Sequence, residues 1–260
     1  IYMTSPLVYR KAVYAACTDE NYQGRACVAC FDASTGRQLW KCKVANAIKN
    51  TIVADDGKIF AQDVDGNLYA IDASSGRVKW QKKLPMKTIL PALIDGIVAK
   101  DGIVYAGSGE ALCAVEAATG KELWRNTGWR RGEGTTSTLS TDGDILIGSA
   151  HWQALYGNDA RTGKLLWRAD KDGIRHRSSS AVIDGGVIYL ASDASLFVID
   201  KQNGNVLSRK QLPFSVNVAS TPLVTDSEII FGTLADGVVA LHRETMDEKW
   251  RLRPEKAMIY

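Results

Sequence analysis

The chain has 260 residues, of which 45% are hydrophobic, and a formal net charge of +3. These values allow a sizeable apolar core, and the charge is too small to indicate a nucleic-acid-binding protein. No apolar run approaches the roughly 18 residues of a membrane-spanning helix, so no membrane span is expected. The sequence begins Ile1-Tyr2-Met3, without an initiator methionine or a signal peptide. We interpret it as a piece of a longer protein, whose targeting signal would lie elsewhere.

A nine-residue motif recurs along the whole chain and sets its organisation. Four copies end in tryptophan after an acidic residue and a glycine, and the last two copies are eroded. The copies cover residues 32–40, 72–80, 116–124, 159–167, 200–208 and 242–250. Their last residues are separated by 40, 44, 43, 41 and 42 positions. A period of this length, held over six copies, predicts a repeat architecture.

The second copy shows what each position does. Asp72 can accept hydrogen bonds from backbone N–H groups just downstream, which favours a tight turn. Gly76 suits the positive φ that such a turn requires. Apolar residues alternate before the turn and again after it, up to Trp80. The motif therefore predicts a β-hairpin that ends on a large aromatic side chain, placed to contact a neighbouring repeat.

Each repeat contains four short strand signals separated by turn residues. In the second repeat they cover residues 50–54, 59–62, 68–71 and 77–82. Four antiparallel strands at this period are typical of a β-propeller blade. We therefore predict an all-β chain, with one propeller domain over residues 1–260. Its six blades are expected at approximately 4–42, 50–83, 92–126, 135–169, 178–211 and 219–253.

The pattern Ala-x-Asp/Glu-x-x-Ser/Thr-Gly-x-x-x-Trp, seen at 70–80 and 114–124, resembles the tryptophan-docking motif of pyrroloquinoline quinone (PQQ)-like β-propellers. The resemblance implies that each docking tryptophan packs against the adjacent blade. It assigns this role to Trp40, Trp80, Trp124, Trp167 and Trp250. Ser208, His242 and Met246 depart from the motif, so weaker docking is expected around the last two blades. Related propellers usually have seven or eight blades, and such repeats also occur beside metallophosphoesterases and other catalytic domains.

Five cysteines, Cys17, Cys27, Cys30, Cys42 and Cys113, leave the redox compartment open. Cys27 and Cys30 have the spacing of a metal-binding pair, but they fall on a predicted strand. Residues three apart on a strand point to opposite faces, so both sulfurs cannot bind one metal. We expect small buried side chains, and a disulfide from Cys17 to either Cys27 or Cys30 stays open.

The connections between blades vary most and should lie on one face, around the mouth of the central channel. The first blade adds a longer loop, residues 19–25, which should share that face. Loops on a rigid scaffold often carry binding residues, and a basic surface attracts anions. The candidate binding residues are Lys49, Asn50, Trp129, Arg130, Arg131, Glu133, Trp152, Arg175, His176, Arg177 and Asn217.

No catalytic residue, metal site or cofactor is predicted. The resemblance to quinoprotein dehydrogenases implies adjacent cysteines and a calcium set, but the chain has no Cys-Cys pair. Glu133 with Asn158 or Asn217 has unpersuasive spacing for calcium. We therefore expect a non-catalytic bacterial scaffold that binds a protein partner or a covalently linked domain and is periplasmic or otherwise exported. The alternative is a quinoprotein-like dehydrogenase or a protein that binds PQQ with calcium, or another small anion.

Overall fold

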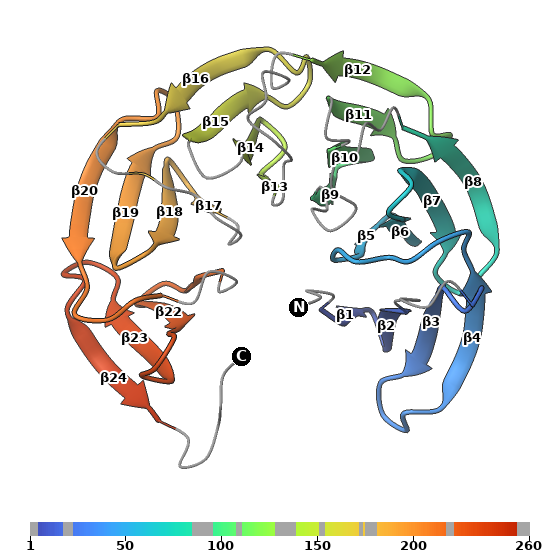
Figure 1. The fold of residues 1–260 in the computed structure, drawn as a ribbon, viewed down its shortest axis with the longest axis horizontal. Coiled ribbons are helices and arrows are strands. Elements are labelled where there is room, and N and C mark those ends of the chain that lie inside the picture. The colour runs from blue at the N-terminus through green and yellow to red at the C-terminus, as the bar shows by residue number, and fades with distance from the viewer. Residues whose placement is uncertain are drawn as a thin grey trace. The chain divides into compact units, whose positions relative to one another are not determined.

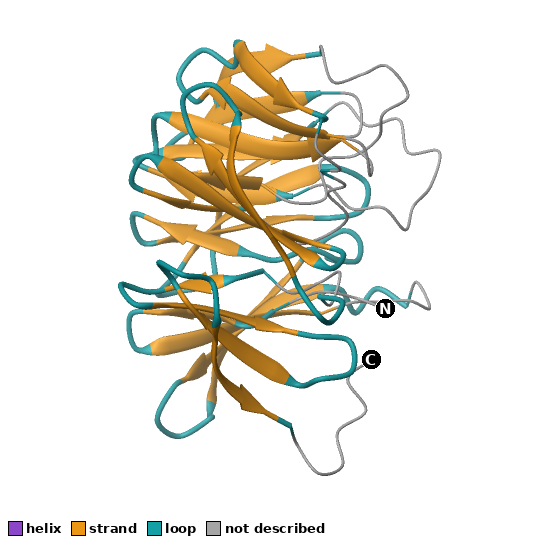
Figure 2. Ribbon diagram, turned by 90° about the vertical axis from the view of Figure 1, so that its left-hand side faces the viewer, coloured by secondary structure: helices purple, strands orange, loops and turns teal. Residues whose placement is uncertain are grey.

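The computed structural model describes residues 5–17, 23–84, 96–107, 111–127, 139–150, 154–171, 174, 181–216 and 221–253. Over these residues it contains strands and loops, as Figure 2 shows, and it has no helix long and apolar enough to cross a membrane. The strands form six four-stranded antiparallel sheets. The all-β class and the six four-stranded repeats predicted from the sequence are therefore confirmed.

The chain divides into two compact units, residues 1–136 and 137–260. The first unit contains sheets 1 to 3, whose strands follow chain order. Sheet 1 comprises β1 (Leu7–Tyr9), β2 (Ala12–Cys17), β3 (Cys27–Asp32) and β4 (Gln38–Lys43). Sheet 2 comprises β5 (Val53–Asp55), β6 (Lys58–Gln62), β7 (Asn67–Asp72) and β8 (Val78–Lys83). Sheet 3 comprises β9 (Ile97–Lys100), β10 (Ile103–Gly107), β11 (Leu112–Glu116) and β12 (Glu122–Asn126).

The second unit contains sheets 4 to 6, built in the same way. Sheet 4 comprises β13 (Leu139–Thr141), β14 (Ile145–Ala150), β15 (Ala154–Asp159) and β16 (Leu165–Ala169). Sheet 5 comprises β17 (Val182–Asp184), β18 (Val187–Ser192), β19 (Ser195–Asp200) and β20 (Val206–Gln211). Sheet 6 comprises β21 (Leu223–Val224), β22 (Glu228–Gly232), β23 (Val238–His242) and β24 (Glu248–Leu252).

Within each unit the sheets lie side by side, with their first strands adjacent. In the first unit β5 contacts both β1 and β9, while β4, β8 and β12 lie on the opposite side of the unit (Figure 1). The middle strands are covered on both faces, so β7 is buried without interruption from Leu68 to Ile71. The fourth strands are covered on one face only, so in β4 exposed Lys41 and Lys43 flank buried Cys42. The core therefore lies between neighbouring sheets.

The recurring motif forms the turn between the third and fourth strands. In sheet 2 the Oδ1 atom of Asp72 accepts hydrogen bonds from the N–H groups of Ser74 (3.1 Å) and Ser75 (2.9 Å). Gly76 has a φ of 71° and donates its N–H to the Asp72 carbonyl at 2.9 Å. The acidic residue and the glycine thus have the local roles that their chemistry predicts.

The tryptophan at the end of a motif contacts the motif of the next sheet. Trp40 donates its indole N–H to the Ala73 carbonyl at 3.0 Å, and its ring covers Gly76. A Cβ atom at Gly76 would lie 2.7 Å from that ring. Two further tryptophans repeat the contact within their units: Trp80 bonds to the Ala117 carbonyl (3.0 Å) and covers Gly120, and Trp167 bonds to the Lys201 carbonyl (2.9 Å) and covers Gly204. The glycine is therefore needed both for its φ and for the close approach of the ring.

Sheets 5 and 6 meet without a docking tryptophan. Ser208 stands at the tryptophan position, and Met246 stands at the glycine position with a φ of 58°. The Met246 side chain is 9% exposed and packs in a cluster that contains Val198, the strand partner of Ser208. The two departures from the motif thus compensate, because a side chain from the glycine position fills the space between the sheets.

Candidate functional site

Two of the candidate binding residues, Lys49 and Asn50, lie on the connection between sheets 1 and 2. Both are partly exposed. The side-chain oxygen of Asn50 accepts the N–H of Thr51 at 2.7 Å, which fixes the backbone just before β5. The neighbouring Ile48 and Ile52 are buried in the core between these sheets. The connection is therefore anchored on both sides of its two polar residues.

A buried carboxylate holds the start of the same connection. Asp63 is 1% exposed, and its Oδ2 atom accepts the hydroxyl hydrogen of Tyr69 at 2.9 Å. The Tyr69 hydroxyl oxygen in turn accepts the N–H of Ala45 at 3.1 Å. The Oδ1 atom of Asp63 accepts the N–H groups of Asp65 (3.0 Å) and Asn67 (2.9 Å). This cluster ties the β6–β7 turn to the connection.

The electrostatics of the cluster favour a protonated phenol beside a carboxylate. Burial raises the pKa of Tyr69 well above its ordinary value, and the hydrogen bond to Asp63 adds to that rise. Tyr69 therefore stays a hydrogen-bond donor throughout the physiological pH range. In the sequence, Asp63 falls between the predicted strands 59–62 and 68–71, where it suggests a turn and not this role. The signal was the acidic turn 63–66 followed by a tyrosine that alternates onto the buried face.

The other candidate binding residues lie outside the described residues, so the structure brings no complete cluster together. They are Trp129, Arg130, Arg131, Glu133, Trp152, Arg175, His176, Arg177 and Asn217. The added loop of the first blade is described only from residue 23 onward. The basic mouth therefore stays a prediction, and Lys49 and Asn50 are the part of it whose surroundings are described.

The docking residues are better defined. Trp40, Trp80 and Trp167 make the contacts given above. The Trp124 ring lies 6.0 Å from that of Tyr105, measured between centroids. Trp250 is 38% exposed, the most open of the five.

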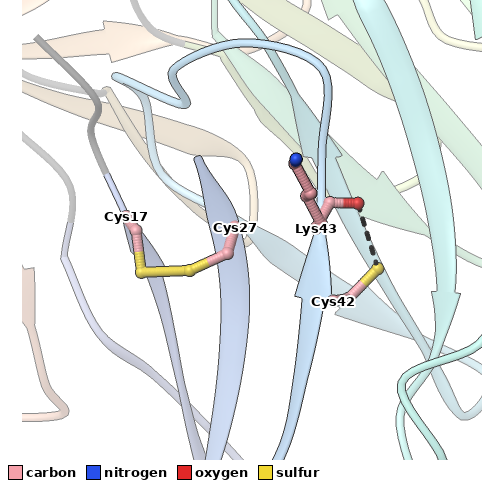
Figure 3. Close-up of a disulfide and its surroundings, with 4 residues drawn as sticks. All are labelled: Cys17, Cys27, Cys42 and Lys43. Atoms are coloured by element: carbon pink, nitrogen blue, oxygen red, sulfur yellow. Dashed lines mark hydrogen bonds between the residues drawn. A yellow bond between two sulfur atoms is a disulfide. The ribbon is translucent and has the colours of Figure 1, made fainter. Parts of the chain in front are cut away.

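The described cysteines include one disulfide, between Cys17 and Cys27 (Figure 3). These residues lie directly opposite each other on β2 and β3, with their Cα atoms 5.1 Å apart, and they close the first blade's added loop. The alternative pairing with Cys30 does not occur. Cys30 is a buried thiol, and burial raises its pKa, as it does for Cys42. Neither thiol has the depressed pKa of a reactive cysteine.

Of the residues considered for a calcium site, the structure describes Asn158. No group of three or more His, Cys, Asp or Glu side chains among them is arranged to hold a metal ion. Asn158 is fully buried within sheet 4 and directs its amide nitrogen to the Leu146 carbonyl at 3.4 Å. Cys17 and Cys27 are joined across two strands, whereas the dehydrogenase pattern needs neighbours in sequence. Glu133 and Asn217 lie outside the described residues.

The chain is similar in sequence to a known protein family and to several characterised proteins. A family model described as "Outer membrane protein assembly factor BamB" matches residues 10–144 and 152–258. The protein of that name from Burkholderia pseudomallei is 21% identical over 78% of this chain and 66% of its own length. Tetrathionate hydrolase of Acidithiobacillus ferrooxidans is 22% identical over 83% of this chain and 47% of its own length. The chain thus spans about half to two thirds of these relatives.

Among solved structures, BamB from Moraxella catarrhalis superposes with a TM-score of 0.72. The sequence identity is 17%, and the match covers 95% of this chain and 74% of the other, so the likeness concerns the fold. The family model covers nearly the whole chain and includes the docking motifs described above. The chain therefore belongs to the PQQ-like β-propeller family described as outer membrane protein assembly factor BamB.

Proposed function

We propose that this chain is a non-catalytic scaffold that binds a protein partner, or an attached catalytic domain, through the loop face that carries Lys49 and Asn50. The observation that carries the proposal is the match of residues 10–144 and 152–258 to a family described as an assembly factor. The described residues add no metal-binding cluster. Family membership therefore favours binding over catalysis.

The surface used would be the basic mouth. Lys49 lies on a segment that the Asp63–Tyr69 cluster holds in place. The backbone of this segment should therefore lose little conformational entropy when a partner binds. Arg130, Arg131, Arg175 and Arg177 come from two later connections of the same kind. Arginine forks match carboxylates in pairs. The positive charges of these residues favour a partner with an acidic surface.

An exported location follows from the same proposal. The Cys17–Cys27 disulfide suits an oxidising compartment such as the periplasm, because cytosolic reductants keep most thiols reduced. The relatives named outer membrane protein assembly factor agree with that location. Expression with and without export to the periplasm, followed by a count of free thiols, tests it. Equal stability and an intact disulfide in both compartments would remove this support.

The test of the binding face is a charge-reversal pair. Arg131→Glu with Arg175→Glu should abolish capture of the partner, while the melting temperature stays nearly unchanged because exposed charges contribute little to stability. The matched control is Arg37→Glu with Arg77→Glu, two exposed arginines of the turns between third and fourth strands. Capture should survive in the control variant. Capture by the intact protein should weaken as the salt concentration rises, because salt screens exposed charges. Undiminished capture by the Arg131/Arg175 variant would show that another surface binds.

The alternative function is that of a quinoprotein-like binder of a small anion, which the similarity to a tetrathionate hydrolase keeps open. A ligand that binds only the folded state raises the melting temperature with concentration. PQQ with calcium, and tetrathionate separately, should then each be titrated against thermal unfolding. A saturable rise for one of them, lost in the Arg131/Arg175 variant, would favour the alternative over the scaffold.

A further inference from the structure

The outer strand of sheet 1, β4, differs from the other outer strands in the partners of its positively charged side chains. Strand β4 is an edge strand, hydrogen-bonded to β3 on one side only within the described residues. Its side chains alternate, with Trp40 and Cys42 directed into the core and Leu39, Lys41 and Lys43 exposed. An edge strand also presents unpaired N–H and C=O groups. β4 thus combines a free backbone edge with two lysines spaced two residues apart.

Those two lysines have no ion pair or hydrogen bond within the part of the chain that the structure describes. In the adjacent sheet, β8 has Gln81 at the position of Lys41 and Lys83 at the position of Lys43. The lysines of β8 are engaged: Lys79 with Asp72 at 3.2 Å, Lys82 with Glu122 at 3.7 Å, and Lys83 with the Asp65 carbonyl. Strands β4 and β8 are therefore both rich in lysine, but they differ in whether the ammonium groups have partners within the described residues. Within the described residues, the ammonium groups of Lys41 and Lys43 have no competing intramolecular partner.

The later sheets show the same contrast at the residue after the tryptophan position. There an arginine lies over an aromatic ring: Arg168 over Tyr156 (5.4 Å), Arg209 over Phe197 (5.2 Å) and Arg251 over Phe214 (5.1 Å). In sheet 1 the equivalent residue is Lys41, and its strand partner is Ala29. Because alanine offers no ring, the lysine side chain stays in solvent.

A disulfide cross-links sheet 1 next to the end of β4. Lys43 is the direct strand partner of Cys27, which is bonded to Cys17 on β2. Figure 3 shows Lys43 with its side chain directed away from the sulfur of its neighbour Cys42, which points into the core. The disulfide thus cross-links β2 and β3 at this end, and β4 is joined to β3 there by strand pairing. A preformed edge loses less entropy when another strand adds to it.

We infer that β4 is a second binding site, which takes an extended acidic peptide segment as an additional strand. Main-chain hydrogen bonds to the free edge would supply affinity, as in other cases of strand addition. Acidic side chains two residues apart would face Lys41 and Lys43, since residues i and i+2 of a strand share one face. Opposite charges facing each other across two strands stabilise the pair.

The probe for this site is a fluorescent peptide of about eight residues in which Glu and Val alternate, a length typical of a strand. It should bind the intact protein saturably by fluorescence anisotropy. A peptide of the same composition, with the Glu and Val residues in separate blocks, should bind about tenfold more weakly, because only alternation puts carboxylates on one face. A peptide that alternates Lys and Val should not bind. Equal binding of the two acidic peptides would overturn the proposal.

Matched variants separate this site from general charge attraction. Lys41→Glu with Lys43→Glu should weaken binding of the alternating peptide by about tenfold or more, because two attractions become repulsions. Lys79→Glu with Lys83→Glu makes the same change in net charge on β8 and should leave binding within about twofold, since these lysines already have partners. Equal losses in both variants would show that only net charge matters. Lys41→Gln with Lys43→Gln provides a milder change that should also weaken binding.

Hydrogen exchange tests the backbone part of the proposal. Addition of a strand should slow exchange of amides in residues 38–43 when the peptide is added, with little change in residues 78–83. Lysines on edge strands can also act to repel other strands. That role predicts no saturable binding and no added protection in β4, and either result would overturn the inference. Variants of the loop face, such as Arg131→Glu with Arg175→Glu, should leave peptide binding unchanged, so the two sites are tested separately.

Discussion

A pair of glycine substitutions isolates the energy of tryptophan docking. Gly36 and Gly76 occupy the same turn position in sheets 1 and 2, with φ values of 70° and 71°. Alanine at either position is strained by about 1–2 kcal/mol, because L-residues disfavour this region. A Cβ at Gly76 would lie 2.7 Å from the Trp40 ring, whereas a Cβ at Gly36 meets no described atom within 4 Å. Overpacking of this kind adds about 1–3 kcal/mol.

We therefore expect Gly36→Ala to lower the free energy of unfolding by about 1–2 kcal/mol and Gly76→Ala to lower it by about 2–5 kcal/mol. Urea titrations followed by circular dichroism provide the measurement. In a Trp40→Ala background the extra cost at Gly76 should disappear, because the opposing ring is gone. Equal costs for the two glycines in the intact protein would refute the docking contact as the reason for the glycine.

Two further predictions concern the acidic position of the motif. His242 replaces it in sheet 6, so the N–H groups of Glu244 and Thr245 do not have the carboxylate acceptor that Asp72 supplies in sheet 2. His242→Asp should therefore raise the free energy of unfolding, measured by urea titration, by about 0.5–1.5 kcal/mol. A lower free energy of unfolding would show that this turn has a different geometry. At Asp32, hydrogen bonds from Ser34 and Thr35 lower the pKa from 3.8 to about 2. Its stabilisation is present above pH 4 and is lost as pH falls towards 2, so Asp32→Asn should flatten the acid dependence of stability over that interval, and an unchanged profile would contradict this.

Much of the fold could be predicted because the motif is local. The acidic residue, the glycine and the tryptophan each act within one hairpin or on its next neighbour, as Asp72, Gly76 and Trp40 show. The period then fixes how many sheets there are. The prediction of six four-stranded repeats rests on those local rules and is confirmed by the structure.

The candidate site could be predicted only in part, because its contacts are not periodic. The sequence pattern places Asp63 in a turn, and its role depends on the burial of Tyr69 and on the backbone N–H of Ala45, which lies on the connection from sheet 1. The partner of Cys17 was open for a similar reason. Strand register decides it, because Cys27 lies opposite Cys17 while Cys30 lies opposite Tyr14.

The interface between sheets 5 and 6 offers the sharpest case of compensation, because two departures from the motif occur in one contact. The φ of 58° at Met246 is strained for a residue with a side chain. On backbone geometry alone, glycine would therefore be tolerated or preferred at this position. Packing opposes this preference, because the Met246 side chain is buried between the sheets. Met246→Gly should relieve about 1–2 kcal/mol of strain and lose about 2–5 kcal/mol of packing. A net loss of stability is expected.

Ser208→Trp alone should also destabilise, because the indole would collide with the methionine in a filled space. The double variant Ser208→Trp with Met246→Gly restores the arrangement of Trp40 over Gly76, so it should be more stable than the sum of the single changes by about 1–3 kcal/mol. Urea titrations of all four proteins give this coupling energy. Additive effects would mean that Ser208 and Met246 do not share one space, and that the last two sheets are held together mainly by other contacts, such as the ion pair between Arg243 and Asp184.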